Sequence, residues 1–262
     1  TYMGSLELPK LKVLVLHTLS YGSGDQFFAM LRGIDLVTTL DLVAFISFTP
    51  SNVPSLSTML QYDAIIFATN YAYVGNPNFN SVKRTIGDRL ADYMDLKGNG
   101  AVLTFMFTYD LSPYYGDAFS LLGRYIDEDY GAFDKATYSF GAAYLGEVLV
   151  PGHAVMQGVK RLSTPLVSPG AMPMTPGAQL IAKWDSGNPA VGVKEMSNGA
   201  RSVNIASLAG AGTSICGGDC QTLIKNAIVW GSSTVVKTND IPSFSHVYGD
   251  NGLYNVDLMV VD

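Results

Sequence analysis

The chain has 262 residues and a formal net charge of −6 at pH 7, with 48% hydrophobic and 15% charged residues. Its length allows one large domain, or one domain with a small appendage, and a sizeable buried core. The acidic balance and the absence of any cluster of lysine and arginine exclude a nucleic-acid partner, because binding phosphate requires a basic face. No apolar run reaches the about 18 to 20 residues that span a bilayer, so we expect no membrane insertion.

The first half of the chain alternates short apolar runs with amphipathic stretches. The run at 12–17 (Lys-Val-Leu-Val-Leu-His) has the continuous apolar character of a strand that is buried on both faces. Strands that alternate with helices at this spacing predict a parallel sheet with right-handed crossovers. The expected elements are strand 12–17, helix 25–33, strand 37–45, helix 54–61, strand 63–69, helix 80–96 and strand 101–107.

The second half of the chain has a different pattern, with more extended segments and fewer helices. Ser197-Asn198-Gly199 is a hairpin turn signal between two expected strands. The expected elements are helix 116–125, extended segments within 136–150, strands 179–185, 190–196 and 201–207, and a closing helix 221–230.

Several of these segments, taken in order, resemble the class I glutamine-amidotransferase-like superfamily and its ThuA-like (trehalose-utilisation) branch. They are 62–66 (Tyr-Asp-Ala-Ile-Ile), 153–159 (His-Ala-Val-Met-Gln-Gly-Val) and 223–230 (Leu-Ile-Lys-Asn-Ala-Ile-Val-Trp). The resemblance covers about residues 11–232. It implies an α/β, flavodoxin-like three-layer sandwich with a mostly parallel central sheet.

The same resemblance points to missing catalytic groups. In the catalytic members, a cysteine sits at the turn after the strand that corresponds to 101–107, and a histidine comes from a late loop. Here the turn at 105–110 reads Phe-Met-Phe-Thr-Tyr-Asp, and His153 lies in the segment that matches a non-catalytic motif. With neither nucleophile nor base, we do not expect amidotransferase or cysteine-hydrolase activity.

The C-terminal residues 244–262 are similar to the closing motif of PKD-type immunoglobulin-like repeats, which are extracellular spacers. The matching pattern is a His-x-Tyr-x-Asp-x-Gly-x-Tyr turn followed by alternating apolar and polar residues. It covers the last two strands of such a repeat. We expect a β-hairpin-like extension that packs outside the α/β domain, either on the domain's own surface or on a neighbouring subunit by strand addition to an exposed edge. In a longer protein, its partner would be the rest of the repeat.

The chain is therefore divided into an N-terminal extension (1–10), a glutamine-amidotransferase-like domain (11–232), a linker (233–242) and a partial PKD-like β segment (243–262).

The two cysteines, Cys216 and Cys220, enclose Gly-Gly-Asp. We expect a local disulfide, which the two glycines favour because they let the loop curl tightly; two free thiols are the alternative. No metal is expected there, because no histidine or second cysteine pair lies nearby.

Candidate ligand-binding residues follow the carboxyl ends of the expected parallel strands, where ligands bind in open sheets. Their aromatic and amide groups suit a glycan. Alternatively, they cover the sheet edge or meet another domain, and His17 is then a hydrogen-bonded strand-end residue. The candidate ligand-binding residues are His17, Tyr21, Asn70, Tyr71, Tyr109 and Asp110.

The acidic stretch 127–129 with Asp134 matches no calcium-binding EF-hand loop, which favours a solvated loop.

Two functions follow from these features. The first is a non-catalytic domain of an extracellular or cell-surface protein, with a role in adhesion, spacing or assembly (a filament or surface layer included) and with glycan binding. Its partners would be other copies of the chain or domains of its parent protein, reached through the C-terminal β segment. The second is a ThuA-like enzyme of carbohydrate metabolism, with His17 and Asp110 as acid and base. Neither requires a cofactor or a metal.

Overall fold

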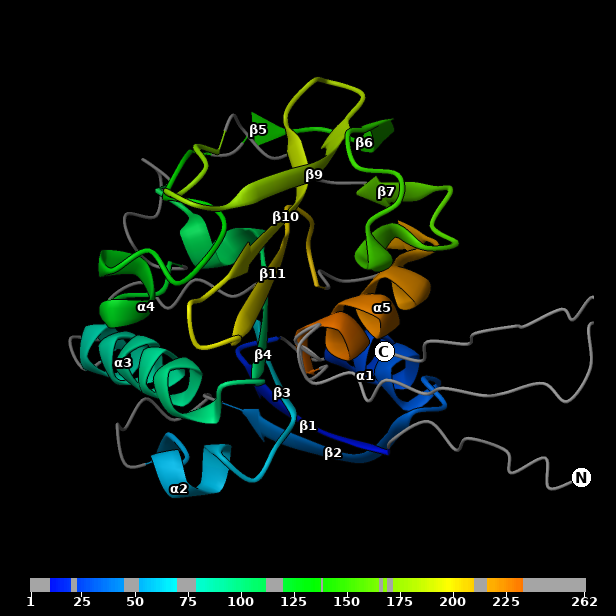
Figure 1. The fold of residues 1–262 in the computed structure, drawn as a ribbon. Helices are drawn as coiled ribbons and strands as arrows, with labels where there is room; N and C mark the ends of the chain where they lie inside the picture. Colours follow the sequence, from blue (N-terminus) through cyan, green and yellow to red (C-terminus); the bar gives the residue numbers. More distant parts are fainter. Residues whose placement is uncertain are drawn as a thin grey trace, which may run out of the picture.

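The computed structural model describes residues 10–19, 23–44, 52–69, 79–111, 120–137, 139–164, 167–168, 172–209 and 216–232. Five strands form the parallel half of a central sheet (Figure 1). Almost all of their residues are buried, except in the outermost strand, as expected for apolar runs with helices on both faces. In spatial order these strands are β2 (Val37–Ala44), β1 (Leu11–His17), β3 (Ala64–Ala68), β4 (Ala101–Phe105) and β11 (Arg201–Ile205).

The sheet continues beyond β11 with five antiparallel strands. Turns join β9 to β10 and β10 to β11 directly, without an intervening helix. A separate two-stranded sheet pairs β5 (Ser139–Phe140) with β8 (Val167–Ser168). In spatial order the antiparallel strands are β10 (Pro189–Glu195), β9 (Gln179–Trp184), β6 (Ala143–Val148), β7 (Leu162–Thr164) and β12 (Gly217–Gly218).

The prediction of a flavodoxin-like sandwich with a mostly parallel sheet is wrong. The structure has a mixed ten-stranded sheet in which four neighbouring pairs are parallel and five are antiparallel. A parallel pair needs a crossover of a dozen or more residues, whereas an antiparallel pair needs only a tight turn. Gly199, with a φ of 92°, supplies such a turn between β10 and β11.

Helices cover the parallel half of the sheet on both faces (Figure 1). Apolar side chains of α1 and α5 pack against one face, and those of α3 and α4 against the other. Among the described residues, no helix combines the length and the apolar character that crossing a bilayer requires. The helices are α1 (Ser23–Arg32), α2 (Leu56–Met59), α3 (Phe79–Lys97), α4 (Arg124–Asp127) and α5 (Cys220–Ser232), with short 3₁₀ turns η2 (Met106–Tyr109) and η4 (Ala154–Met156).

Most expected elements lie within a few residues of the observed ones, but three differ. The helix expected at 54–61 is reduced to the four residues of α2. The strand expected at 101–107 ends at Phe105, where η2 begins. Of the helix expected at 116–125, residues 116–119 lie outside the described part, 120–123 are not helical and α4 begins at Arg124. The N-terminal residues 1–9 and the C-terminal residues 233–262 also lie outside the described part.

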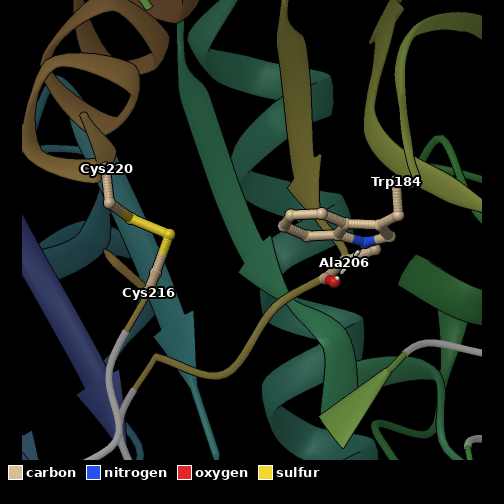
Figure 2. Close-up of a disulfide and its surroundings, with 4 residues drawn as sticks. All are labelled: Trp184, Ala206, Cys216 and Cys220. Atoms are coloured by element: carbon tan, nitrogen blue, oxygen red, sulfur yellow. Dashed lines mark hydrogen bonds between the residues drawn. A yellow bond between two sulfur atoms is a disulfide. The ribbon is translucent and has the colours of Figure 1, made fainter. Parts of the chain in front are cut away.

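The predicted disulfide is confirmed, because Cys216 and Cys220 are joined with their Cα atoms 5.7 Å apart. Figure 2 shows it beside the segment that leaves β11, where the indole N–H of Trp184 donates to the Ala206 carbonyl at 3.0 Å. Between the cysteines, Gly218 has a φ of 73° and lies so close to Arg161 that a Cβ would overlap the Arg161 carbonyl oxygen. A disulfide of this kind is typical of an oxidising compartment.

Candidate functional site

The carboxyl ends of β1, β3, β4 and β11 meet at one edge of the sheet, where open sheets bind ligands. Backbone and hydroxyl hydrogen bonds hold these ends together. The Thr18 N–H donates to the Ala68 carbonyl at 3.0 Å, and its hydroxyl donates to Thr69 at 2.7 Å. The Met106 N–H donates to the Ser207 carbonyl at 3.1 Å. Hydrogen bonds therefore join the carboxyl end of β1 to that of β3, and the end of β4 to that of β11.

Three of the six candidate ligand-binding residues fall within the described part of the chain, namely His17, Tyr109 and Asp110. All three are buried, with 7%, 1% and 2% of their surfaces exposed. Tyr21, Asn70 and Tyr71 lie outside the described residues.

His17 ends β1 in an apolar setting. Its ring meets Phe28 of α1 edge-on, with centroids 4.7 Å apart, and its Nδ1 accepts a hydrogen bond from the Leu19 N–H at 3.3 Å. Burial lowers the pKa of His17 to about 4, because desolvation penalises the imidazolium. The imidazole is therefore neutral at neutral pH, with Nδ1 occupied and Nε2 carrying the proton. In this state it holds the strand end and can donate one hydrogen bond.

The stability of the fold should fall as the pH drops from 6.5 towards 4. Over this range the unfolded chain binds a proton at His17 that the native state excludes, so protonation favours unfolding. The pKa of His153 is also lowered, by burial and by the charge of Arg201, so His153 adds to the loss. Denaturant unfolding at pH 7.5 and pH 5 measures the effect. His17→Asn keeps an acceptor for the Leu19 N–H and should show a smaller loss; an equal loss would contradict this assignment to His17.

The turn after β4 places its side chains inside the protein. Met106, Phe107, Thr108 and Tyr109, which make up η2, are all buried. The Tyr109 hydroxyl shares a hydrogen bond of 2.9 Å with Thr104, and burial raises its pKa well above the ordinary value. Tyr109 therefore anchors the turn to the sheet interior and offers no surface to a ligand.

Asn204 is the centre of this anchor, although the sequence analysis did not single it out. Its Nδ2 donates to the Tyr109 hydroxyl at 2.5 Å and to the Thr104 hydroxyl, and its Oδ1 accepts from the Ala132 N–H at 2.5 Å. The available signal was an amide side chain within the strand expected at 201–207, since a polar group that is buried in a sheet must find hydrogen-bond partners.

Asp110 follows the turn and is held through its backbone. It forms an isolated parallel bridge with Ala136, and the Leu111 N–H donates to the Ala136 carbonyl at 3.0 Å. In the sheet, β3 separates β1, which ends at His17, from β4, and Asp110 follows β4 only after the η2 turn.

Two of the acidic residues at 127–129, Asp127 and Glu128, form ion pairs with arginines. Glu128, together with Asp92 and Asp95 of α3, forms ion pairs with Arg124 at 3.0, 2.5 and 2.9 Å. Arg84 approaches Asp127 to 3.5 Å. Within the described ranges, no group of three or more His, Cys, Asp and Glu residues is arranged to hold a metal ion. These carboxylates dock α4 on α3.

His153 begins the segment that resembles the ThuA-like motif, and it has a structural role. Its Nδ1 accepts the Val155 N–H at 3.2 Å and thereby caps η4. Its ring lies 5.0 Å from the ring of Trp230 in α5. The contact joins two of the three segments on which the family resemblance rests.

No family model matches the chain, and no curated protein matches it. Among solved structures, a ThuA-like protein from Parabacteroides merdae matches 86% of this chain and 91% of its own, with a TM-score of 0.52 and 13% identity. A glutamine amidotransferase from Thermotoga maritima matches 75% of this chain and 74% of its own, with a TM-score of 0.42 and 11% identity, which is too low to support an argument. The predicted likeness to a ThuA-like protein is confirmed at the level of the fold.

Proposed function

We propose that this chain is a non-catalytic domain of an extracellular or cell-surface protein, with a role in adhesion, spacing or assembly. The observation that carries the proposal is the buried turn η2, at the position where the family resemblance places the catalytic cysteine. A nucleophile must be exposed to its substrate and adjacent to a base. Here Met106, Phe107 and Tyr109 fill the turn and face inward.

Two further features support an extracellular or surface location. The Cys216–Cys220 disulfide suits an oxidising compartment. The sequence of 244–262 is similar to part of a PKD-type repeat, and we propose that this β segment mediates self-association or contact with other domains. A glycan site at the carboxyl edge would be built from Tyr21, Asn70 and Tyr71, because the other three candidate residues are buried.

An enzyme of carbohydrate metabolism with a ThuA-like fold is the second candidate. It is favoured by the burial of His17 and Asp110 at the same edge of the sheet, since titratable groups in such settings are often functional.

An activity assay separates the two candidates. The purified protein is incubated with glutamine and with a model ester, and His17→Asn and Asp110→Asn serve as matched variants. We expect no hydrolysis above that of the variants, because no exposed nucleophile is present at η2. Turnover that disappears in Asp110→Asn while the circular dichroism spectrum is retained would overturn the non-catalytic proposal. Calorimetry with oligosaccharides, repeated on Tyr71→Ala, tests the glycan site.

A further inference from the structure

The two edges of the central sheet differ in how they end. One edge strand, β12, has two residues and continues into α5 next to the disulfide. The other, β2, has eight residues, the largest number of any strand in the described part of the chain. Within that part, β2 pairs only with β1, so its outer backbone groups have no strand partner there. An edge of this length is a template for a further strand.

β2 lacks the features that usually protect an edge. It contains no lysine, arginine or proline, and its one charged residue, Asp41, accepts a hydrogen bond from the Tyr62 hydroxyl at 2.5 Å. The irregularity in its register lies at its start, so 39–44 pair regularly with β1. Leu40 and Leu42 pack on the core shared with α1 and α5 but stay only half-buried. A neighbouring strand would complete their burial.

The last described helix, α5, approaches the start of β2 midway along its length. The Lys225 ammonium of α5 pairs with Asp35 at 2.8 Å, and Asp35 lies two residues before β2. At the end of α5, the Arg201 guanidinium lies 4.8 Å from the centre of the Trp230 ring and donates to the Trp230 carbonyl. Figure 1 shows α5 beside α1 over the parallel half of the sheet. The exit point of the chain is therefore held in place.

The distance to the edge is within reach of the linker. A Cβ at Gly231 would lie 2.5 Å from the Cβ of Ala101, so α5 ends over the start of β4. From β4 to a position beyond β2 there are four strand spacings, or about 19 Å. The ten residues 233–242 span at most about 33 Å when extended.

The sequence beyond the linker has the composition of a strand. Residues 253–261 (Leu-Tyr-Asn-Val-Asp-Leu-Met-Val-Val) place Tyr254, Val256, Leu258 and Val260 on one face, and they contain no proline. The sequence alone places this segment outside the central sheet; the open edge at β2 provides a strand for it to join. We propose that residues 253–261 pair with the outer edge of β2 of the same chain as an additional strand. In the assembly role proposed above, the same segment would join a neighbouring copy; the intrachain pairing places it on its own β2 edge instead, and the deletion described below separates the two.

Hydrogen exchange of the β2 amides tests the pairing in the full chain. In the full-length protein, 38–44 should exchange slowly and the protein should be monomeric by light scattering. Deleting 243–262 should speed the exchange of about half of these amides by at least tenfold, since alternate N–H groups of β2 point away from β1. The deletion should also produce oligomers, which light scattering detects. Leu258→Asp leaves the chain length unchanged and should act in the same direction. Deletion of 1–9 is the control and should leave β2 protection unchanged.

Three results would overturn the proposal. Equal protection of β2 with and without 243–262 would show that another segment covers the edge. Loss of protection on deletion of 1–9 alone would assign the edge to the N-terminal residues. A full-length oligomer that the tail deletion converts into monomers would show that the segment joins neighbouring copies. None of these results depends on hydrolysis, so failure of the pairing and failure of the non-catalytic proposal are distinguishable.

Discussion

Replacing Asn204 with alanine should lower the free energy of unfolding by about 3 to 4 kcal/mol. The amide serves three buried groups at once, namely the Ala132 N–H and the hydroxyls of Thr104 and Tyr109. Without it, the Ala132 N–H loses its acceptor inside the protein and cannot reach water. The substitution also leaves a cavity between β11 and η2, so the turn after β4 should loosen as well.

Urea unfolding followed by circular dichroism measures this loss. Thr104→Val is the matched variant, because it removes one hydroxyl partner of Asn204 and keeps the acceptor for the Ala132 N–H; it should cost less than Asn204→Ala if that acceptor is the main contribution. Gln179→Ala, at an exposed position on β9, should change the unfolding free energy by less than about 0.5 kcal/mol. A loss below about 1 kcal/mol for Asn204→Ala would show that the buried network does not hold the turn.

Replacing Gly87 with alanine should destabilise the protein by about 3 kcal/mol, although alanine is the better helix former by about 1 kcal/mol. Gly87 lies in α3, where a Cβ would overlap the carbonyl oxygen of Leu122 and approach its carbonyl carbon to 3.0 Å. Both atoms belong to the backbone, so no side chain can rotate away. The helix and the segment before α4 must separate, which also strains the ion pairs of Arg124.

The same substitution at Gly152 provides the control. A Cβ there meets nothing within 4 Å, and the backbone is not in the positive-φ region. Gly152→Ala should therefore leave the stability unchanged or raise it slightly, because it reduces the freedom of the unfolded chain. Thermal unfolding of both variants compares the two positions. If Gly87→Ala proved as stable as Gly152→Ala, the close approach of α3 to Leu122 would be wrong.

For the candidate site, sequence reasoning located the edge but not the direction of its side chains. It placed His17, Tyr109 and Asp110 at strand ends; His17 does end β1, whereas Tyr109 lies in η2 and Asp110 directly follows it. The burial of Tyr109 depends on the packing of η2 against Thr104 and Asn204, which lie on two different strands. Asn204 and Tyr109 are 95 residues apart in the chain, so no local pattern connects them.

The sequence by itself determined the features that depend on near neighbours. Continuous apolar runs predicted β1, β3 and β4, the turn at Asn198-Gly199 predicted the hairpin of β10 and β11, and the glycines between Cys216 and Cys220 predicted the disulfide. Only the tertiary structure decided the direction of β6, β7, β9 and β12 in the sheet, the inward position of Tyr109 and the open edge at β2. Strand pairing depends on which distant segments share a hydrogen-bonded edge, and an apolar run has the same pattern in a parallel and in an antiparallel sheet.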